Sequence, residues 1–352
     1  LSAYFQRTNH LTINPMHNQP IIECIPNFSE GRNVKVINAI AAAIRREKGV
    51  KLLHIDQGEA ANRTVFTFAG VPEAVVEAAF QAIKVAGNLI DMRRQTGEHP
   101  RIGATDVCPL VPIANISMAT VRQYALQLGE RVGNRLGIPV YLYEKSAQTP
   151  NRKNLATIRS GEYEGLAKKM QQVDWQPDFG KKFNAKTGAT VIGARDFLIA
   201  YNVNLDSPSA YIANQIAREI RESGKVVKKV SGEKVRIPGK CKFLKAIGWY
   251  IEEYRQAQVS INLTNYKITG IHHAFEACKA EAQSHQTTIT GSELIGLIPK
   301  AALLAAGQFY YKKEKRTVSM EEEALLELAI QRLGLNDLAP FDYRKRVIEY
   351  LL

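Results

Sequence analysis

The segment TGEHPRIGATDVCP, residues 96–109, carries one histidine, His99, among charged and turn-forming residues. Histidine gives and takes a proton near neutral pH because its unperturbed pKa is about 6.5. A loop that follows an expected helix can present this side chain to a cleft. His99 is therefore the strongest candidate for a general acid–base catalyst, and the alternative is a histidine that only caps a turn.

Polar residues near two expected strand ends could contact a substrate. Asp56 ends the run KLLHID, where it could orient an imidazole or hold a cation, and a turn-forming role is the alternative. Asn62 and Arg63 open the next run, and Arg101 follows His99. Because arginine binds carboxylates through two parallel hydrogen bonds, these three residues are candidates for anionic substrate groups, with surface solvation as the alternative.

Signatures of metal, nucleotide and serine-nucleophile chemistry are missing from the sequence. The four cysteines are widely separated and form no CxxC pair, which predicts neither a zinc site nor a disulfide framework and fits a reducing cytoplasm. We expect each cysteine to be a small buried residue, including Cys108, which is near His99 but lies in the apolar run VCPLVPI. The other histidines lack metal-ligand spacing, so no metal is expected, and there is no GxxxxGK[ST], GxGxxG or GxSxG motif.

The net charge of +13 is unevenly distributed. Residues 225–245 carry eight lysines and arginines against Glu233 alone, so this segment supplies about half of the excess. A basic loop is usually only solvated, and its functional alternative is a landing site for a polyanionic ligand tail. No apolar run approaches the roughly 20 residues that cross a bilayer, so no membrane partner is expected.

The elements that must position these residues follow from the spacing of apolar side chains in the 352-residue chain. Residues 1–19 are expected to be an extension outside the fold. The next segments predict strand, helix, strand, strand, helix and strand at 21–25, 33–47, 51–56, 63–69, 72–92 and 106–113. A further helix (118–136) and strand (140–144) extend this ferredoxin-like βαββαβ pattern, whose two helices cover one face of an antiparallel sheet.

The same order of elements recurs in the second half. Strand, helix, two strands, helix and strand are expected at 195–205, 207–223, 245–264, 270–285 and 287–298. The interpretation is an α+β protein of two ferredoxin-like subdomains, 20–198 and 199–352, packed with a substrate cleft between them. Residues 175–194 predict a linker or binding loop, and a helix at 320–333 with the tail after it is expected to pack onto the body.

Several long stretches together resemble one family, the formiminotransferase domain (glutamate formimidoyltransferase). The resemblance runs from about Ile21 to the C-terminus and is carried by ECIPNFSEGRN (23–33), DQGEAANRTVFTFAG (56–70), LIDMRRQTGEHPRIGATDVCPLVP (89–112), RSGEYEGL (159–166), DWQPDFG (174–180), GARDFLIAYNVNL (193–205), IGWYIEE (247–253) and DLAPFDYRKRVIEYLL. It implies two related α/β subdomains and a homodimer. In animals this domain is fused to a cyclodeaminase, so here the resemblance implies a stand-alone transferase with a separate cyclodeaminase in the pathway.

The reaction that the resemblance implies belongs to histidine breakdown and one-carbon metabolism. The family transfers the formimidoyl group of N-formimidoyl-L-glutamate to N5 of tetrahydrofolate, which serves as co-substrate without a metal. The catalytic histidine of the family's GEHPR motif falls on His99, and the assisting aspartate falls on Asp56. Arg63 and Arg101 are candidates for substrate carboxylates.

The folate-contacting segment of the family falls on residues 180–189. These are Gly180, Lys181, Lys182, Phe183, Asn184, Ala185, Lys186, Thr187, Gly188 and Ala189. The chain departs here from the animal pattern, which has proline, serine and tryptophan where this chain has three lysines, Asn184 and Thr187. These lysines and those of 225–245 are candidates for contacting the acidic folate tail.

Three other functions compete with this interpretation. A formyl transfer, from N-formylglutamate or its 5-formyl folate counterpart, differs only by oxygen in place of NH. A basic ferredoxin-like RNA-binding module would use the alternating aromatics of RTVFTFAG, although the sequence lacks the RNA-recognition signature and nucleic acid is not the expected partner. A non-catalytic folate binder is the third, and the intact GEHPR stretch argues against it.

Overall fold

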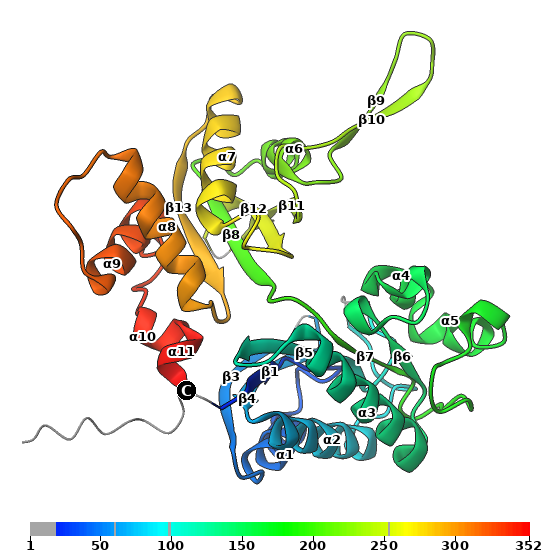
Figure 1. Ribbon diagram of the computed structural model, residues 1–352. Coiled ribbons are helices and arrows are strands. Elements are labelled where there is room, and N and C mark those ends of the chain that lie inside the picture. Colours follow the sequence, from blue (N-terminus) through cyan, green and yellow to red (C-terminus); the bar gives the residue numbers. More distant parts are fainter. Residues whose placement is uncertain (1–18, 60, 98–99, 253) are drawn as a thin grey trace, which may run out of the picture. The chain divides into compact units, whose positions relative to one another are not determined.

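The computed structural model describes residues 19–59, 61–97, 100–252 and 254–352, and it divides into two compact units between Arg195 and Asp196 (Figure 1). Each unit is mixed α+β with a sheet of its own. His99, the main catalytic candidate, lies outside the described residues, as do residues 1–18.

The N-terminal unit is built on a mixed sheet of seven strands within the described residues. The strands are β1 (Ile21–Cys24), β2 (Asn27–Phe28), β3 (Val50–Gly58), β4 (Arg63–Gly70), β5 (Thr105–Ala114), β6 (Val140–Leu142) and β7 (Thr190–Ala194). Strand β3 pairs with β4, β4 pairs with β1 and β2, and both of these pair with β5, all antiparallel. Strand β7 then adds to β5 and β6 to β7 in parallel.

Three long helices cover one face of this sheet: α1 (Val34–Arg45), α2 (Pro72–Leu89) and α3 (Met118–Leu136) (Figure 1). Local signals explain where they begin. Asn33 caps α1 by accepting hydrogen bonds from the backbone N–H groups of Lys35 and Val36, and Pro72 occupies the first turn of α2, where its missing N–H costs nothing. Their apolar stripes bury against the sheet, as the periodicity predicts.

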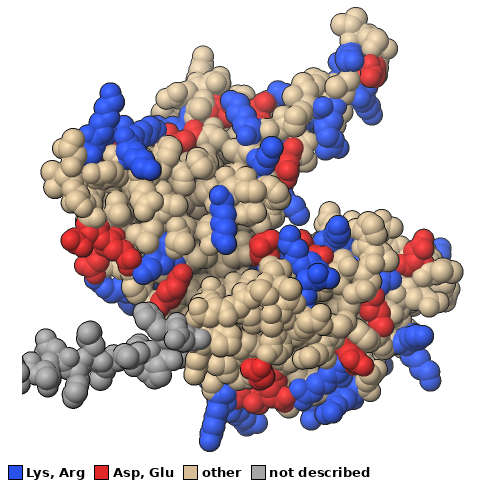
Figure 2. Space-filling model, in the orientation of Figure 1, with Lys and Arg blue, Asp and Glu red and all other residues tan. Residues whose placement is uncertain are grey.

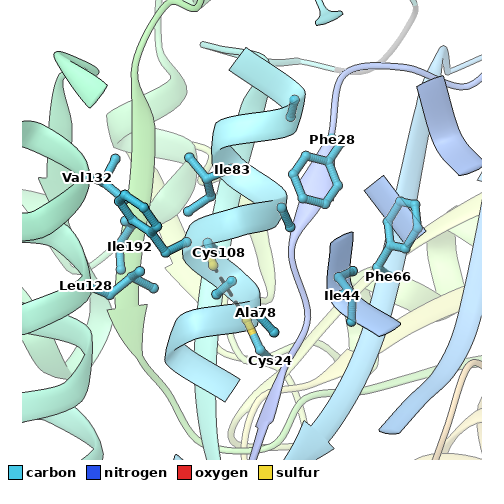
Figure 3. Close-up of a cluster of buried hydrophobic side chains, with 14 of the residues drawn as sticks. Cys24, Phe28, Ile44, Phe66, Ala78, Ile83, Cys108, Leu128, Val132 and Ile192 are labelled. Carbon is cyan, nitrogen blue, oxygen red and sulfur yellow. Dashed lines mark hydrogen bonds between the residues drawn. The ribbon is translucent and has the colours of Figure 1, made fainter. Parts of the chain in front are cut away.

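Strands β5 and β7 are buried on both faces, which explains their continuous apolar character. Cys108 and Ile192 point into the core under α1 to α3, whereas their neighbours Val107 and Val191 point into a second core (Figure 3). That second core is closed by two short helices, α4 (Leu155–Arg159) and α5 (Glu162–Lys169). A strand buried on both faces shows no polar alternation, because side chains on both faces avoid water.

The prediction for residues 175–194 was wrong in part. Residues 190–194 are neither linker nor loop but form the buried strand β7, and all five of its residues are buried. The predicted strand at 140–144 is shorter, because β6 ends at Leu142 and a short 3-10 turn (Glu144–Ser146) follows. The sheet is also mixed rather than purely antiparallel, since β5, β7 and β6 run parallel.

The C-terminal unit contains the expected order of strand, helix, two strands, helix and strand, with a hairpin inserted after the first helix. Its antiparallel sheet contains β8 (Ile199–Leu205), β11 (Leu244–Ile251), β12 (Gln256–Leu263) and β13 (Ile289–Ile295). Helices α6 (Ala210–Ile220) and α7 (Ile271–Ser284) connect these strands. The spatial order β11-β12-β8-β13 is the same, element for element, as β3-β4-β1-β5 in the N-terminal unit.

Further helices follow β13: α8 (Lys300–Lys313), α9 (Glu322–Leu333), α10 (Tyr343–Arg346) and α11 (Ile348–Leu351). Helix α9 matches the helix expected at 320–333, and α8 had no counterpart in the sequence analysis. No helix among the described residues is both long enough and apolar enough to cross a membrane.

The basic segment 225–245 is not a plain loop. Strands β9 (Lys225–Lys228) and β10 (Lys234–Ile237) pair as an antiparallel hairpin, and Lys245 already belongs to β11. The hairpin extends from the rest of the C-terminal unit, and lysines and arginines occur along it (Figures 1 and 2). Its valines at 226, 227 and 230 are exposed, so these side chains do not pack into a hydrophobic core.

The four cysteines are buried free thiols, as expected. Cys24 and Cys108 face each other across β1 and β5 with their Sγ atoms 3.5 Å apart (Figure 3). Burial raises the pKa of the Cys24 thiol, which keeps it protonated. Cys108 has 0% exposure and so cannot reach a substrate, which removes it as a nucleophile.

Candidate active site

The backbone on the N-terminal side of His99 is held by Asn62. This residue adopts a left-handed conformation with φ of 46° and is 8% exposed. Its Oδ1 accepts a hydrogen bond from the N–H of Gly31 (2.9 Å), and its Nδ2 donates to the carbonyl of Thr96 (2.7 Å). Its carbonyl accepts from the Gln95 side chain (3.1 Å). Asn62, expected to contact substrate, therefore joins three loops through its own amide groups.

Gly97 fits this arrangement because it has no side chain. A Cβ atom at this position would lie 2.3 Å from the carbonyl oxygen of Ala61, which is far inside van der Waals contact. The backbone of residues 96–97 therefore lies directly against the turn between β3 and β4.

The backbone on the C-terminal side of His99 is held by Arg101, which is 8% exposed. Its guanidinium donates to the carboxylates of Glu162 (3.0 Å) and Glu164 (2.7 and 2.8 Å). It also donates to the side chain (2.7 Å) and carbonyl (3.1 Å) of Gln95. Arginine has five N–H donors, and these five bonds use all of them. The expected role in binding a substrate carboxylate thus competes with partners already in place.

A hollow of about 470 Å³ lies beside these residues. Its lining consists of Thr96, Gly97, Arg101, Gly161, Glu162 and Glu164. Residues 96–97 and 101 flank His99 in the chain, so this hollow adjoins the segment that carries the candidate base. It mixes two carboxylates with the guanidinium of Arg101, whose donors are already used within the protein, so the charged groups of the lining offer hydrogen-bond acceptors rather than free donors.

The segment 180–189 packs beside the same region. Ala104 donates to the carbonyl of Thr187 (2.7 Å), and Ala189 donates to the carbonyl of Ile102 (3.0 Å). Gly188, with φ of 64°, would place a Cβ atom 2.2 Å from the Ile102 carbonyl oxygen. Residues 102–104 follow His99 closely, so the tertiary structure brings the predicted folate segment next to the predicted catalytic loop.

Tyr163 ties the two segments together. Its N–H donates to the carbonyl of Arg101 (2.9 Å), and its hydroxyl donates to the carbonyl of Ala185 (2.6 Å). Its ring lies 6.3 Å from that of Phe183 between centroids. Helix α5 therefore holds both segments through its first three residues.

The side chains of segment 180–189 divide into two groups. Asn184 accepts hydrogen bonds from the N–H groups of Lys186 (3.1 Å) and Thr187 (3.2 Å), and Lys186 Nζ donates to the carbonyl of Asn88 (2.6 Å). These contacts hold the loop in shape. Lys181 and Lys182 are exposed, and Phe183 is 38% exposed, so these side chains are available to a ligand.

Asp56 and Arg63 belong to one electrostatic cluster. Asp56 is exposed on β3, and its charge acts on Arg63 at the start of β4. The guanidinium of Arg63 donates to Asn27. Burial, followed by the positive charge of Arg159, lowers the pKa of Arg63 to about 10. That value is well above 7, so Arg63 stays cationic at neutral pH.

Arg159 ends α4 and forms a buried ion pair with Asp106 of β5. Asp106 is 1% exposed, and its other oxygen accepts from the N–H of Ile102 (3.1 Å). A buried carboxylate needs such partners because losing water is costly. The pair therefore holds the backbone at residue 102.

Several positioning residues were missed by the sequence analysis: Gln95, Asp106, Arg159, Glu162, Tyr163 and Glu164. Residues 159–166 were noted only as part of the resemblance. Their signal was a run of charged residues, which usually indicates a solvated surface.

The base-stacking role considered for RTVFTFAG conflicts with the structure. Phe66 and Phe68 have 0% exposure and belong to the core under α1 and α2 (Figure 3 labels Phe66). Stacking of nucleic-acid bases requires exposed aromatic faces. Among the described residues, no group of three or more histidine, cysteine, aspartate or glutamate side chains could hold a metal ion.

Fold and site together define a two-unit α+β protein in which ion pairs hold residues that follow the acid–base candidate in the chain. Residues 21–195 match the formiminotransferase domain, N-terminal subdomain, and residues 200–352 match the formiminotransferase domain. The chain therefore belongs to the formiminotransferase domain family.

Curated relatives fall into two groups by length. The formimidoyltransferase-cyclodeaminase of Mus musculus is 48% identical over 94% of this chain, which spans 60% of that protein. The glutamate formimidoyltransferase of Streptococcus pyogenes serotype M1 is 43% identical over 84% of this chain and 94% of its own length. That of Thermoplasma acidophilum is 41% identical over 82% and 92%, respectively.

Proposed function

We propose that this protein transfers the formimidoyl group of N-formimidoyl-L-glutamate to N5 of tetrahydrofolate, releasing L-glutamate and 5-formimidoyltetrahydrofolate. The similarity to two glutamate formimidoyltransferases over more than nine-tenths of their length supports this activity. The observation that carries the proposal is the packing of segment 180–189 against residues 102–104, directly after the GEHPR loop.

The chemistry requires one group that both takes and gives a proton. Attack of N5 on the amidine carbon produces a tetrahedral intermediate, N5 loses a proton, and the departing glutamate nitrogen gains one. His99 would act as base and then as acid. Asp56 would hold the cationic formimidoyl group or stabilise the imidazolium, and its exposed position on β3 leaves the carboxylate accessible.

Tetrahydrofolate would be the co-substrate. Residues 180–189 would contact it, with Phe183 offering a partly exposed ring and Lys181 and Lys182 offering cations to its acidic tail. Arg101 and Asn62 would act chiefly by positioning the catalytic loop, because their polar groups already bind within the protein.

We further propose that residues 20–198 and 199–352 are two ferredoxin-like subdomains. The shared strand order of the two sheets supports this assignment. A homodimer, a separate cyclodeaminase and a cytoplasmic location complete the proposal; the four free thiols are compatible with the last.

A direct assay tests the proposed activity. Purified protein is mixed with tetrahydrofolate and, in parallel, with N-formimidoylglutamate or N-formylglutamate, and the folate product is followed by its absorbance. We expect the 5-formimidoyl product. The rate of its formation should fall by a factor of about 10² to 10⁴ in His99→Ala, because general acid–base catalysis contributes that much to the rate. Exclusive formyl transfer would favour the alternative donor, and unchanged turnover in His99→Ala would refute the assigned role.

A further inference from the structure

A second hollow lies in the C-terminal unit, between the start of α7 and the middle of α8. Its volume is about 490 Å³. Its lining includes four rings and two lysines: Tyr266, His272, His273, Phe309, Lys267 and Lys312. The proposed transfer reaction uses none of these residues, and all of them belong to one unit.

The rings of His272, His273 and Phe309 contact one another at tilted or edge-on angles. The His272 ring lies 4.7 Å from that of Phe309, with 30° between their planes, and 4.1 Å from that of His273. His272 is 6% exposed, whereas Phe309 is only partly buried. The partly exposed ring of Phe309 therefore gives one wall of the hollow an aromatic surface that a planar ligand could stack on.

The Nδ1 atom of His272 is a buried polar atom. Within the part of the chain that the structure describes, this atom has no hydrogen-bond partner. Burial, and then the nearby His273, lowers the pKa of His272 to about 4, so the ring is neutral at pH 7. An unsatisfied buried polar atom costs free energy, and a ligand that bonds to it recovers part of that cost.

Gly270 leaves no side chain against the edge of the His272 ring. A Cβ atom at residue 270 would lie 2.6 Å from Cε1 of His272 and 2.9 Å from its Nδ1. Any side chain there would occupy the space beside the ring edge. The glycine is also the residue that precedes α7, a helix of 14 residues whose first N–H groups lack partners within the helix.

The charges at the hollow favour an anion. Lys267 and Lys312 line it and are exposed, and the positive end of the α7 dipole adds to their potential. The nearby carboxylate of Glu276 is neutralised by its ion pair with Lys313 (2.5 Å).

We propose that this hollow binds a planar aromatic carboxylate. The ring of the ligand stacks on Phe309, beside His272, and the carboxylate meets the lysines and the start of α7. The site is separate from the proposed formimidoyl transfer and does not depend on it.

Binding to the full chain can be measured by calorimetry without folate or formimidoylglutamate. The probes are benzoate, cyclohexanecarboxylate and inorganic phosphate. Cyclohexanecarboxylate has the charge of benzoate without an aromatic ring, and phosphate supplies only charge. We expect benzoate to bind about fivefold more tightly than cyclohexanecarboxylate, because stacking contributes up to about tenfold.

Variants locate the site. We expect Phe309→Leu and Gly270→Ala each to weaken benzoate binding about fivefold or more, since the first removes the stacking face and the second fills the space at His272. His285→Gln, at the other end of α7, is the matched control and should bind like the parent. Thermal unfolding checks that each variant folds. If one of the two variants does not fold, the other still tests the site.

Equal binding of benzoate and cyclohexanecarboxylate would overturn the proposal, as would benzoate binding that both variants leave intact. Phosphate binding of the same strength as benzoate would mean an adventitious ion only. A failed transferase assay would leave the benzoate result standing, so the two proposals fail separately.

Discussion

The Arg101 guanidinium illustrates how one side chain can act on chemistry that it does not perform. It binds two glutamates and Gln95 through all of its donors. Lysine keeps the charge but loses the planar fork. We expect Arg101→Lys to lower kcat about tenfold through misplacement of the neighbouring His99, with the KM for formimidoylglutamate nearly unchanged.

The split between kcat and KM decides between two roles for Arg101. If the KM for formimidoylglutamate rises instead while kcat is retained, Arg101 binds the substrate carboxylate and not the loop. Arg93→Lys is the control, because Arg93 pairs with Asp91 at 2.5 Å on the same loop but its side chain is 59% exposed.

Asp56 can be tested by removing its charge alone. Asparagine has the same shape, so Asp56→Asn leaves β3 intact and removes the anion. We expect kcat to fall about a hundredfold, because the cationic formimidoyl group or the imidazolium loses its counter-charge. Steady-state kinetics measure the effect, and Glu59→Gln, an exposed carboxylate three residues further on, serves as control. Equal rates in both variants would exclude Asp56 from the reaction.

At the scale of elements, helices α4 and α5 act as a clamp on residues 101–106, through their ion pairs with Arg101 and Asp106. The clamp depends on the pair between Arg159 and Asp106, whose carboxylate is 1% exposed. We expect Arg159→Met to destabilise the protein by about 3 to 5 kcal/mol, because it leaves a buried charge without its partner. Denaturant-induced unfolding measures this change.

A double variant separates charge from packing. Adding Asp106→Asn to Arg159→Met removes the stranded charge and should restore part of the lost stability. Arg344→Met breaks an exposed pair with Glu323 and is expected to cost no more than about 1 kcal/mol. If Arg159→Met and Arg344→Met lower the free energy of unfolding equally, the pair between Arg159 and Asp106 contributes no more than an exposed ion pair.

Over the whole molecule, the net charge of +13 predicts that polyanionic substrates are attracted to the protein. The hairpin of β9 and β10 carries lysines 228, 229 and 234, and replacing all three by glutamine removes charge without touching a core. Each exposed contact between a lysine and a carboxylate of the folate tail contributes up to about 1 kcal/mol. We therefore expect the KM for a polyglutamylated tetrahydrofolate to rise about three- to tenfold and to depend less on salt concentration.

The monoglutamate form of the folate is the internal control, since it lacks the tail and its KM should not change. A second triple variant, with glutamine at exposed lysines 35, 48 and 51 of the N-terminal unit, matches the charge removed. If both triple variants raise the KM equally, the hairpin has no particular role and only the total charge matters.

The periodic spacing of apolar residues predicted most helices and strands, because side chains along one segment face the core and the solvent in turn. Helix 118–136 has the same bounds in the structure, and the repeated order of elements in the two halves is also present. Strand β7 was missed because five residues buried on both faces carry no alternation. Helix α5 was missed because only Leu166 of its eight residues is buried, so it lacks an apolar stripe.

The sequence by itself determined the secondary structure of the segments whose apolar residues recur periodically, the burial of the cysteines, the family and the choice of His99 as catalytic candidate, since each rests on neighbouring residues or on a motif. Only the tertiary structure decided which charges meet. Arg101 pairs with Glu162 and Glu164, and Arg159 with Asp106, across more than 50 residues of chain. Ion pairs carry no periodic signal, so their partners are set by how strands and helices pack.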